Sequence, residues 1–126
     1  MNQEVIDNLK DRIQENENKF AMTEPYFNMD KEEEKTIYFG VMNQKDETSD
    51  FTVEFLCDEA FDSRAKPETD IVFEYADSIE GLKKDEIEVF PLVVKTTEDA
   101  KPTEYKCKAL IGPESYATRA FIITVV

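Results

Sequence analysis

The sequence predicts an all-β domain, an antiparallel β-sandwich of about seven strands, with an amphipathic helix at its N-terminus. Three observations predict this fold class. After residue 25, apolar residues recur at every second position in several short segments, and polar, turn-forming linkers separate these segments. Helical spacing of apolar residues is confined to the first twenty residues. A length of 126 residues supports one domain with one core, and the short segments favour a sandwich over βαβ units.

The N-terminal segment carries a single apolar stripe. Its members are separated by 3, 4 and 7 positions, the spacing of one helix face: Ile6, Leu9, Ile13 and Phe20. We therefore expect an amphipathic helix over residues 1–22 and a sandwich over residues 23–126. A helix of about four turns is marginal alone and must dock its stripe on something. The stripe either packs on the domain itself or belongs to a stalk, the soluble end of a longer helix held in a membrane or filament.

Seven segments after the helix alternate apolar and polar residues and are expected to be strands. In order they are 26–29, 35–43, 51–57, 70–75, 86–95, 104–111 and 118–126. In the third segment, for example, Phe51 and Val53 share one face while Thr52 lies on the other. Pro91 interrupts the alternation of the fifth segment. Because proline cannot donate to a β-ladder, we expect a bulge or a sheet edge there.

Charge and composition exclude several classes of function. Fifteen basic and 29 acidic residues give a net charge of −14, which argues against nucleic acid or an anionic membrane surface as a partner. No segment approaches the roughly 20 apolar residues of a membrane span. The N-terminus lacks the basic start and apolar centre of a signal peptide, so the chain is either cytosolic or a soluble piece of a longer protein.

The sequence lacks several residue types and motifs on which catalysis commonly depends. The chain has no histidine, which removes the usual Ser/Cys–His nucleophiles and most catalytic zinc sites. Its three glycines are not grouped, so no phosphate-binding loop is present. We expect no enzymatic activity and, calcium excepted, no cofactor.

The two cysteines, Cys57 and Cys107, both fall on the apolar parity of their segments. A structural zinc site needs about four ligands and a catalytic thiol needs a neighbouring base, and two cysteines without histidine supply neither. Two readings remain open. One is a disulfide, which implies an oxidising, extracytoplasmic compartment, and the other is a pair of buried thiols in a reducing one.

Two stretches resemble immunoglobulin-like domains. In "TTEDAKPTEYKC", Tyr105 stands two residues before Cys107, as in the tyrosine corner near the start of strand F, where the hydroxyl is anchored to backbone just upstream. The stretch "EPYFNMDKEEEKTIYFGVMNQKDETSDFTVEF" has the order strand, acidic turn, strand, polar loop and strand. Over residues 25–126 the pattern resembles the immunoglobulin-like domains of archaeal and bacterial cell-surface proteins, including CARDB-type domains and those of archaellum stator and pilin-like proteins.

The resemblance implies an immunoglobulin-like β-sandwich in which Cys57 and Cys107 meet. If residues 35–43 are strand B, then 51–57 is strand C, which neighbours strand F in one sheet. If 51–57 is strand B instead, a bridge would cross between the sheets. Both assignments bring the two sulfur atoms close together.

Acidic loops are the candidate cation sites, because calcium takes six to eight oxygen ligands. Two loops each gather three carboxylates: Asp46, Glu47 and Asp50 in one, and Asp58, Glu59 and Asp62 in the other. Neither loop has the EF-hand spacing. The alternative is that these loops, like residues 30–35, are solvated turns of an acidic protein.

The C-terminal segment is uncharged from residue 120 to the last residue and strongly β-prone. It is either an ordinary half-buried strand or a free edge that, like the strand containing Pro91, exchanges a strand with a partner. The candidate interface residues are accordingly Ile6, Leu9, Ile13, Phe20, Phe121, Ile123 and Val125. Large residues on the opposite parity are further candidates: Leu56, Val72, Phe90 and Leu110.

These expectations favour a non-catalytic assembly or anchoring domain of a cell-surface or appendage protein, pilus- or archaellum-like, located outside the cytoplasm. It would act through contacts with a protein partner or with further copies of itself. Two alternatives remain: a calcium- or ligand-binding extracellular module, and a cytoplasmic adaptor for a basic partner.

Overall fold

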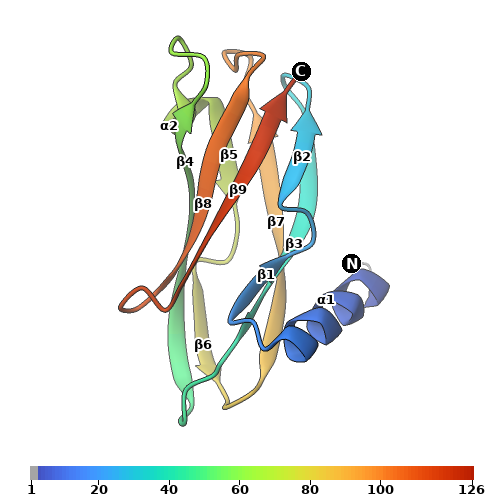
Figure 1. Ribbon diagram of the computed structural model, residues 1–126, viewed down its shortest axis with the longest axis vertical. Coiled ribbons are helices and arrows are strands. Elements are labelled where there is room, and N and C mark those ends of the chain that lie inside the picture. The colour runs from blue at the N-terminus through green and yellow to red at the C-terminus, as the bar shows by residue number, and fades with distance from the viewer. Residues whose placement is uncertain (1–2) are drawn as a thin grey trace.

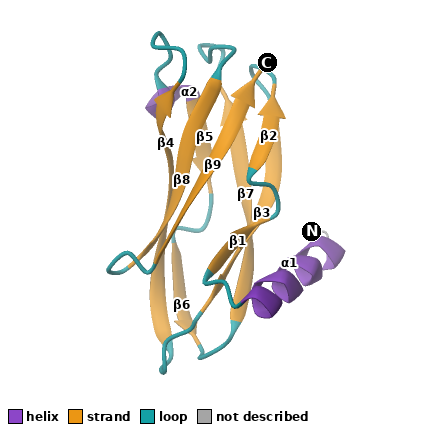
Figure 2. Ribbon diagram, in the orientation of Figure 1, coloured by secondary structure: helices purple, strands orange, loops and turns teal. Residues whose placement is uncertain are grey.

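Two β-sheets pack face to face in the computed structural model, which describes residues 3–126, and a helix lies outside them (Figures 1 and 2). The first sheet has the order β1-β3-β7-β5 and the second β2-β9-β8-β4-β6. The elements are α1 (Gln3–Asn16), β1 (Phe20–Met22), β2 (Tyr26–Met29), β3 (Glu34–Met42), β4 (Ser49–Ala60), α2 (Pro67–Asp70), β5 (Ile71–Glu74), β6 (Ser78–Leu82), β7 (Ile87–Thr96), β8 (Glu104–Gly112) and β9 (Ala117–Val125). No helix among residues 3–126 is both long and apolar enough to cross a membrane.

The strand order is that of an immunoglobulin-like sandwich. Strands β1, β3, β7 and β5 correspond to A, B, E and D, and β9, β8 and β4 to G, F and C. All seven expected strands are present, and β1 and β6 are two further strands that the sequence pattern did not reveal. One pairing departs from the antiparallel expectation, since β2 runs parallel to β9 with Tyr26 opposite Ile122. The first strand is therefore split around Pro25, with β1 in one sheet and β2 in the other.

Helix α1 ends at Asn16 and not at residue 22, where the expected helix ends, and residues 1–2 of the expected helix lie outside the described residues. Glu17 adopts a left-handed conformation (φ 51°), and the chain turns into β1. Phe20 therefore leaves the helical stripe. It lies opposite Val41 of β3, and its ring centroid is 6.1 Å from that of Phe39 inside the sandwich. The N-terminal segment is a helix followed by the first strand.

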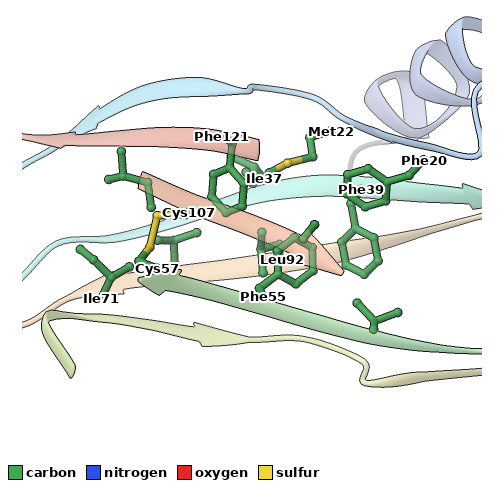
Figure 3. Close-up of a cluster of buried hydrophobic side chains, with 14 of the residues drawn as sticks. Phe20, Met22, Ile37, Phe39, Phe55, Cys57, Ile71, Leu92, Cys107 and Phe121 are labelled. Carbon is green, nitrogen blue, oxygen red and sulfur yellow. A yellow bond between two sulfur atoms is a disulfide. The ribbon is translucent and has the colours of Figure 1, made fainter. Parts of the chain in front are cut away.

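Aromatic side chains fill the interior between the sheets (Figure 3). Phe55 of β4 occupies a central position, with its ring centroid 5.0 Å from that of Phe39 in the opposite sheet and 6.1 Å from that of Phe121. Strand β9 is paired with β8 on one side and β2 on the other. Its inward residues Phe121, Ile123 and Val125 are consequently part of the core, and β9 has no free edge along these pairings.

Pro91 lies inside β7 without the expected bulge, because the register with β3 runs through it, with Pro91 opposite Tyr38. Even-numbered residues of β7 turn their N–H groups toward β3, as Thr96 does in donating to Glu33 (3.0 Å). Odd-numbered residues, Pro91 included, face the β5 side, where pairing ends opposite Val93. The missing N–H of proline therefore falls where β7 has a partner strand on one side only, although β7 is a central strand of its sheet.

Helix α1 covers the outer face of the first sheet, over β1, β3 and β7 (Figure 1). Leu9 and Ile13 pack there with Ala21 and Met42, a cluster we call the helix seam. Gly40 of β3 permits the close approach, because a Cβ atom at that position would lie 2.6 Å from Ile13 Cδ1. The apolar stripe of the helix thus docks on its own domain.

Candidate functional site

The side chains expected at an interface lie inside the folded molecule. All seven are at most 7 % exposed: Ile6, Leu9, Ile13, Phe20, Phe121, Ile123 and Val125. The stripe of α1 is buried against the first sheet, and the other four residues line the interior. These positions offer no surface to a partner while the chain is folded. The expectation was wrong because alternating apolar residues occur both in strands that bind a partner and in strands that line a core. A contact surface has to be sought elsewhere.

Only a few large apolar side chains among residues 3–126 are exposed. They are Tyr26, Phe61, Val72 and Val126, and Phe61 is the most exposed at 88 %. Of the further candidates, Val72 on the edge strand β5 is among them, whereas Leu56, Phe90 and Leu110 are half-buried. Phe61 lies in the connection between β4 and α2, a segment that the sequence pattern marks only as a polar linker.

The Cys57–Cys107 disulfide is present and lies within one sheet (Figure 3). The two residues are directly opposite each other on β4 and β8, with their Cα atoms 3.8 Å apart. Val53 and Phe55 direct their N–H groups away from β8, toward Asp77 and Tyr75. Cys57 lies two residues further along the same strand, so it too belongs to a non-hydrogen-bonded pair with β8. Such pairs bring opposing Cα atoms closest. Cys57 is therefore on strand C, and the bridge does not cross between the sheets.

Tyr105 is fully buried and ties the start of β8 to two other segments. Its hydroxyl accepts a hydrogen bond from the Lys101 N–H (2.8 Å), the upstream backbone contact of a tyrosine corner. The same hydroxyl donates to Asp70 Oδ2 (2.8 Å), which also accepts from the Lys66 N–H (2.8 Å). Burial is the main reason that the pKa of Tyr105 rises to about 12. Asp70 is itself 2 % exposed, so a buried polar network holds this end of the sandwich.

The segment from Phe61 to Lys66, which we call the Phe61 loop, is held at both ends by hydrogen bonds, and at its end the Lys66 N–H joins it to Asp70. The Phe61 N–H donates to the Glu104 carbonyl (3.0 Å), and the Asp62 N–H donates to Thr103 Oγ1 (2.9 Å). Within the loop, Arg64 pairs with the Asp62 carboxylate at 2.7 Å and lowers its pKa to about 2. The backbone of the loop is thus fixed while the Phe61 ring projects into solvent.

The Phe61 loop shares one end of the sandwich with the C-terminus (Figure 1). Thr103 links the two, since its carbonyl accepts from the Val125 N–H (2.9 Å) while its hydroxyl accepts from Asp62. Val126, the next residue, is exposed. Sequence patterns missed this end because an isolated aromatic residue in a polar linker has no periodicity. The only signal was that Phe61 is the one aromatic residue between Cys57 and Asp70.

The acidic loops do not gather into a metal site in the described part of the chain. Asp46 pairs with Lys84 (3.6 Å), and Asp50 accepts a hydrogen bond from the Gly81 N–H (2.8 Å). In the second loop each carboxylate faces a separate cation: Asp58 with Lys108, Glu59 with Lys106 and Asp62 with Arg64. No group of three potential ligands occurs among residues 3–126, and calcium binding at Asp46, Glu47 and Asp50 stays a prediction.

Two carboxylates do line one hollow. Glu17 and Asp85 border a space of about 420 Å³ beside the end of α1, together with Gln14, Met42 and Gln44. A two-carboxylate mechanism needs a cleft that encloses the substrate, and both of these carboxylates lie on exposed turns. We assign this hollow no catalytic role.

Comparison with known proteins identifies the fold. No protein-family model matches the sequence, and no curated protein is detectably similar to it. Among solved structures, a family 123 glycoside hydrolase from Clostridium perfringens matches with a TM-score of 0.59 and 11 % identity, over 80 % of this chain and 22 % of the hydrolase. Domains 4 and 5 of the S-layer protein SbsC match with a TM-score of 0.54 and 10 % identity, over 85 % of this chain and 50 % of that one.

A third match is of similar size to this chain. A PapD-like domain of human CEP192 aligns with a TM-score of 0.50 and 10 % identity, over 86 % of this chain and 85 % of that one. The chain spans only about a fifth of the hydrolase and half of the S-layer structure. At such low identity these likenesses show a shared architecture, and the class of protein they define is an immunoglobulin-like and PapD-like β-sandwich.

Proposed function

We propose that this domain is a non-catalytic assembly or anchoring module of a cell-surface or appendage protein, of the pilus or archaellum kind. It contacts a protein partner, or a further copy of the same protein, through the Phe61 loop. The observation that carries the proposal is the 88 % exposure of Phe61 on a loop whose backbone is fixed by hydrogen bonds.

An aromatic side chain held out on a rigid loop suits protein recognition. Aromatic anchors supply much of the binding energy at interfaces when they fill a pocket on the partner. A fixed backbone lowers the entropy lost on binding, because the loop does not have to be ordered at that moment. The hydrogen bonds from Asp62 to Thr103 and from Lys66 to Asp70 supply that rigidity here.

The disulfide and the fold support an extracytoplasmic location. Intramolecular disulfides persist in oxidising compartments and are rare in the cytosol, and Cys57 and Cys107 form one. The likeness to domains of a surface-layer protein fits the same setting. Mass measurement without reductant, on protein taken directly from its own cells, is expected to find the oxidised form. Two free thiols would favour the cytoplasmic adaptor instead.

Site-specific photo-crosslinking tests the contact. A photoreactive phenylalanine analogue replaces Phe61 in the full-length protein in its own cells, and the matched control carries it at Val72, the exposed residue on β5. We expect irradiation to give a discrete crosslinked product, with a second copy or one defined protein, from position 61 only. No product from position 61, or the same products from both positions, would overturn the proposal. Phe61→Ser, in which the fold is retained, should lose the same complex.

A further inference from the structure

A second surface combines positive charge with a concave shape, on the side of the molecule where α1 and the start of β9 border the same hollow. Two hollows of about 280 Å³ and 360 Å³ adjoin there and share Asn18 and Arg119 as lining residues. We call this surface the arginine groove and define it by five residues: Arg12, Asn16, Asn18, Lys19 and Arg119. It draws on α1, the α1–β1 connection and β9, away from the Phe61 loop at the end of the sandwich (Figure 1).

The cations of the arginine groove have no carboxylate partner among residues 3–126. Seven ion pairs occur in that part of the chain, and none includes Arg12, Lys19 or Arg119. The Arg12 guanidinium donates to the Met22 carbonyl, and the Lys19 ammonium donates to the Tyr116 carbonyl (3.4 Å). Both are thus positioned by neutral acceptors that leave their charge uncompensated.

The three arginines of this acidic chain differ in their pairing. Six of the 15 basic residues form ion pairs within residues 3–126, and among the three arginines Arg64 does so, with Asp62 at 2.7 Å. The other two arginines border the same hollow without such a pair. One acidic residue, Glu17, lines the adjoining hollow. The groove is therefore a local site of positive charge on a protein whose net charge is −14.

We propose that the arginine groove binds carboxylate side chains of an acidic segment on a partner protein. Guanidinium groups present planar pairs of donors that match a carboxylate, and the Asn16 and Asn18 amides can pair with the peptide backbone between such side chains. The dimensions of the two hollows suit a few side chains of an extended segment. A long polyanion such as nucleic acid would be repelled by the surrounding negative charge, whereas a short segment samples only charges within about 8 Å at physiological salt.

The three arginine side chains provide the test, because their Nε–Hε signals can be resolved by NMR and Arg64 is an internal control already paired with Asp62. Titration with a hexaglutamate peptide should shift the Arg12 and Arg119 signals and leave Arg64 in place. We expect a Kd below about 1 mM at low salt. Equal movement of all three signals, or no movement, would overturn the proposal.

Matched variants separate specific binding from a general effect of charge. Arg119→Gln should weaken hexaglutamate binding about ten-fold, and Arg119→Lys should weaken it less, because lysine keeps the charge but not the paired donors. Lys31→Gln, which removes the same charge from an exposed turn between β2 and β3, should have no effect. Phe61→Ser should also have no effect, so failure of this site and failure of the Phe61 contact are distinguishable. If inorganic phosphate binds the same arginines as tightly as hexaglutamate, the assignment to a protein segment is overturned.

Discussion

Buried apolar side chains stabilise both the sandwich interior and the helix seam, but only the interior also contains a covalent link between strands. The interior joins residues from both sheets and contains the Cys57–Cys107 bridge, whose ends are separated by 50 residues. The helix seam joins one 14-residue helix to the outside of the first sheet through Leu9, Ile13, Ala21 and Met42. The interior therefore defines the domain, and the seam adds one element to it.

This difference implies two levels of stability. A helix of this length is marginal in water, so α1 depends on docking for its structure. Undocking would expose only the seam and would leave the paired strands intact. Proteins open in such cooperative units, with free energies that range from near zero to that of global unfolding. We expect α1 to open locally at a lower free energy than the sandwich.

The largest effect is expected from removing the covalent link in the interior. Cys57→Ala/Cys107→Ala should lower the free energy of unfolding by about 4 kcal/mol, since the bridge closes a loop of 50 residues and restricts the unfolded chain. Urea denaturation measures the change. Reduced wild-type protein should unfold at nearly the same urea concentration as the variant. An unchanged midpoint in both would show that the interior does not depend on the bridge.

A pair of identical substitutions should separate the interior from the seam. Ile37 and Ile13 are both almost completely buried, the first between the sheets and the second under α1. Ile37→Ala should destabilise the whole domain by about 3 kcal/mol, through lost burial and a cavity. Ile13→Ala should lower global stability less and should accelerate amide hydrogen exchange mainly within α1.

Hydrogen exchange measured by mass spectrometry on both variants decides the outcome. If Ile13→Ala accelerates exchange equally in α1 and in β8, the helix and the sandwich open as one unit. The proposed separation into two levels would then be wrong.

The sequence predicted the interior better than it predicted the surfaces, and the reason is periodicity. Alternation placed Cys57 and Cys107 on inward faces, and the resemblance to immunoglobulin-like domains then brought them together. The three-residue strand β1 is too short to show a period, and the seven-residue step from Ile13 to Phe20 imitated one more helical turn. Phe20 was therefore assigned to the wrong element.

Features that depend on contacts between distant residues could not be predicted locally. Asp70 looks like the polar start of a strand, and its burial depends on the Tyr105 hydroxyl 35 residues away. The exposure of Phe61 likewise depends on Thr103 and Glu104, which fix its loop. Arg12 and Arg119 are separated by most of the chain, and only the docking of α1 brings them to one groove. Candidate surfaces therefore required the fold, whereas the core did not.

A smaller effect is expected at the polar end of the interior. Tyr105→Phe removes the hydroxyl that joins Lys101 and Asp70 and should cost about 2 kcal/mol at neutral pH, because it leaves a buried carboxyl with one partner fewer. The pH dependence should change as well. The pKa of Tyr105 is about 12 in the folded chain against 10.0 for an ordinary tyrosine, so the unfolded chain releases this proton first.

The contribution of the Tyr105 proton to wild-type stability should therefore be fully present below pH 10 and should be lost, by up to about 3 kcal/mol, as the pH rises from 10 to 12. The Tyr105→Phe variant should show a correspondingly flatter decline. Tyr116 also has a pKa raised by burial, so only the difference between the two proteins reports on Tyr105. Urea denaturation at a series of pH values measures it. Parallel curves for the two proteins would contradict the assignment.

The smallest effect is expected at Gly40, where the seam meets the sheet. In Gly40→Ala the new Cβ would lie 2.6 Å from Ile13 Cδ1 and 3.2 Å from Val89 Cγ2. The end of the isoleucine side chain can move, so the cost should be about 1 kcal/mol and should appear as faster amide exchange in α1. Gly112→Ala is a matched control on the second sheet, where the new Cβ would meet Thr52 Oγ1 at 2.6 Å. It should leave exchange in α1 unchanged.

A double-mutant cycle identifies the contact responsible. In the Ile13→Ala background the clashing methyl group is absent, so Gly40→Ala should cost less there than in the wild-type protein. The difference between the two costs measures the coupling between the helix and the sheet at this single point. Equal costs in both backgrounds would mean that Gly40 acts on β3 itself. The position of α1, and with it the arginine groove beside it, would then have to depend on other contacts of the seam.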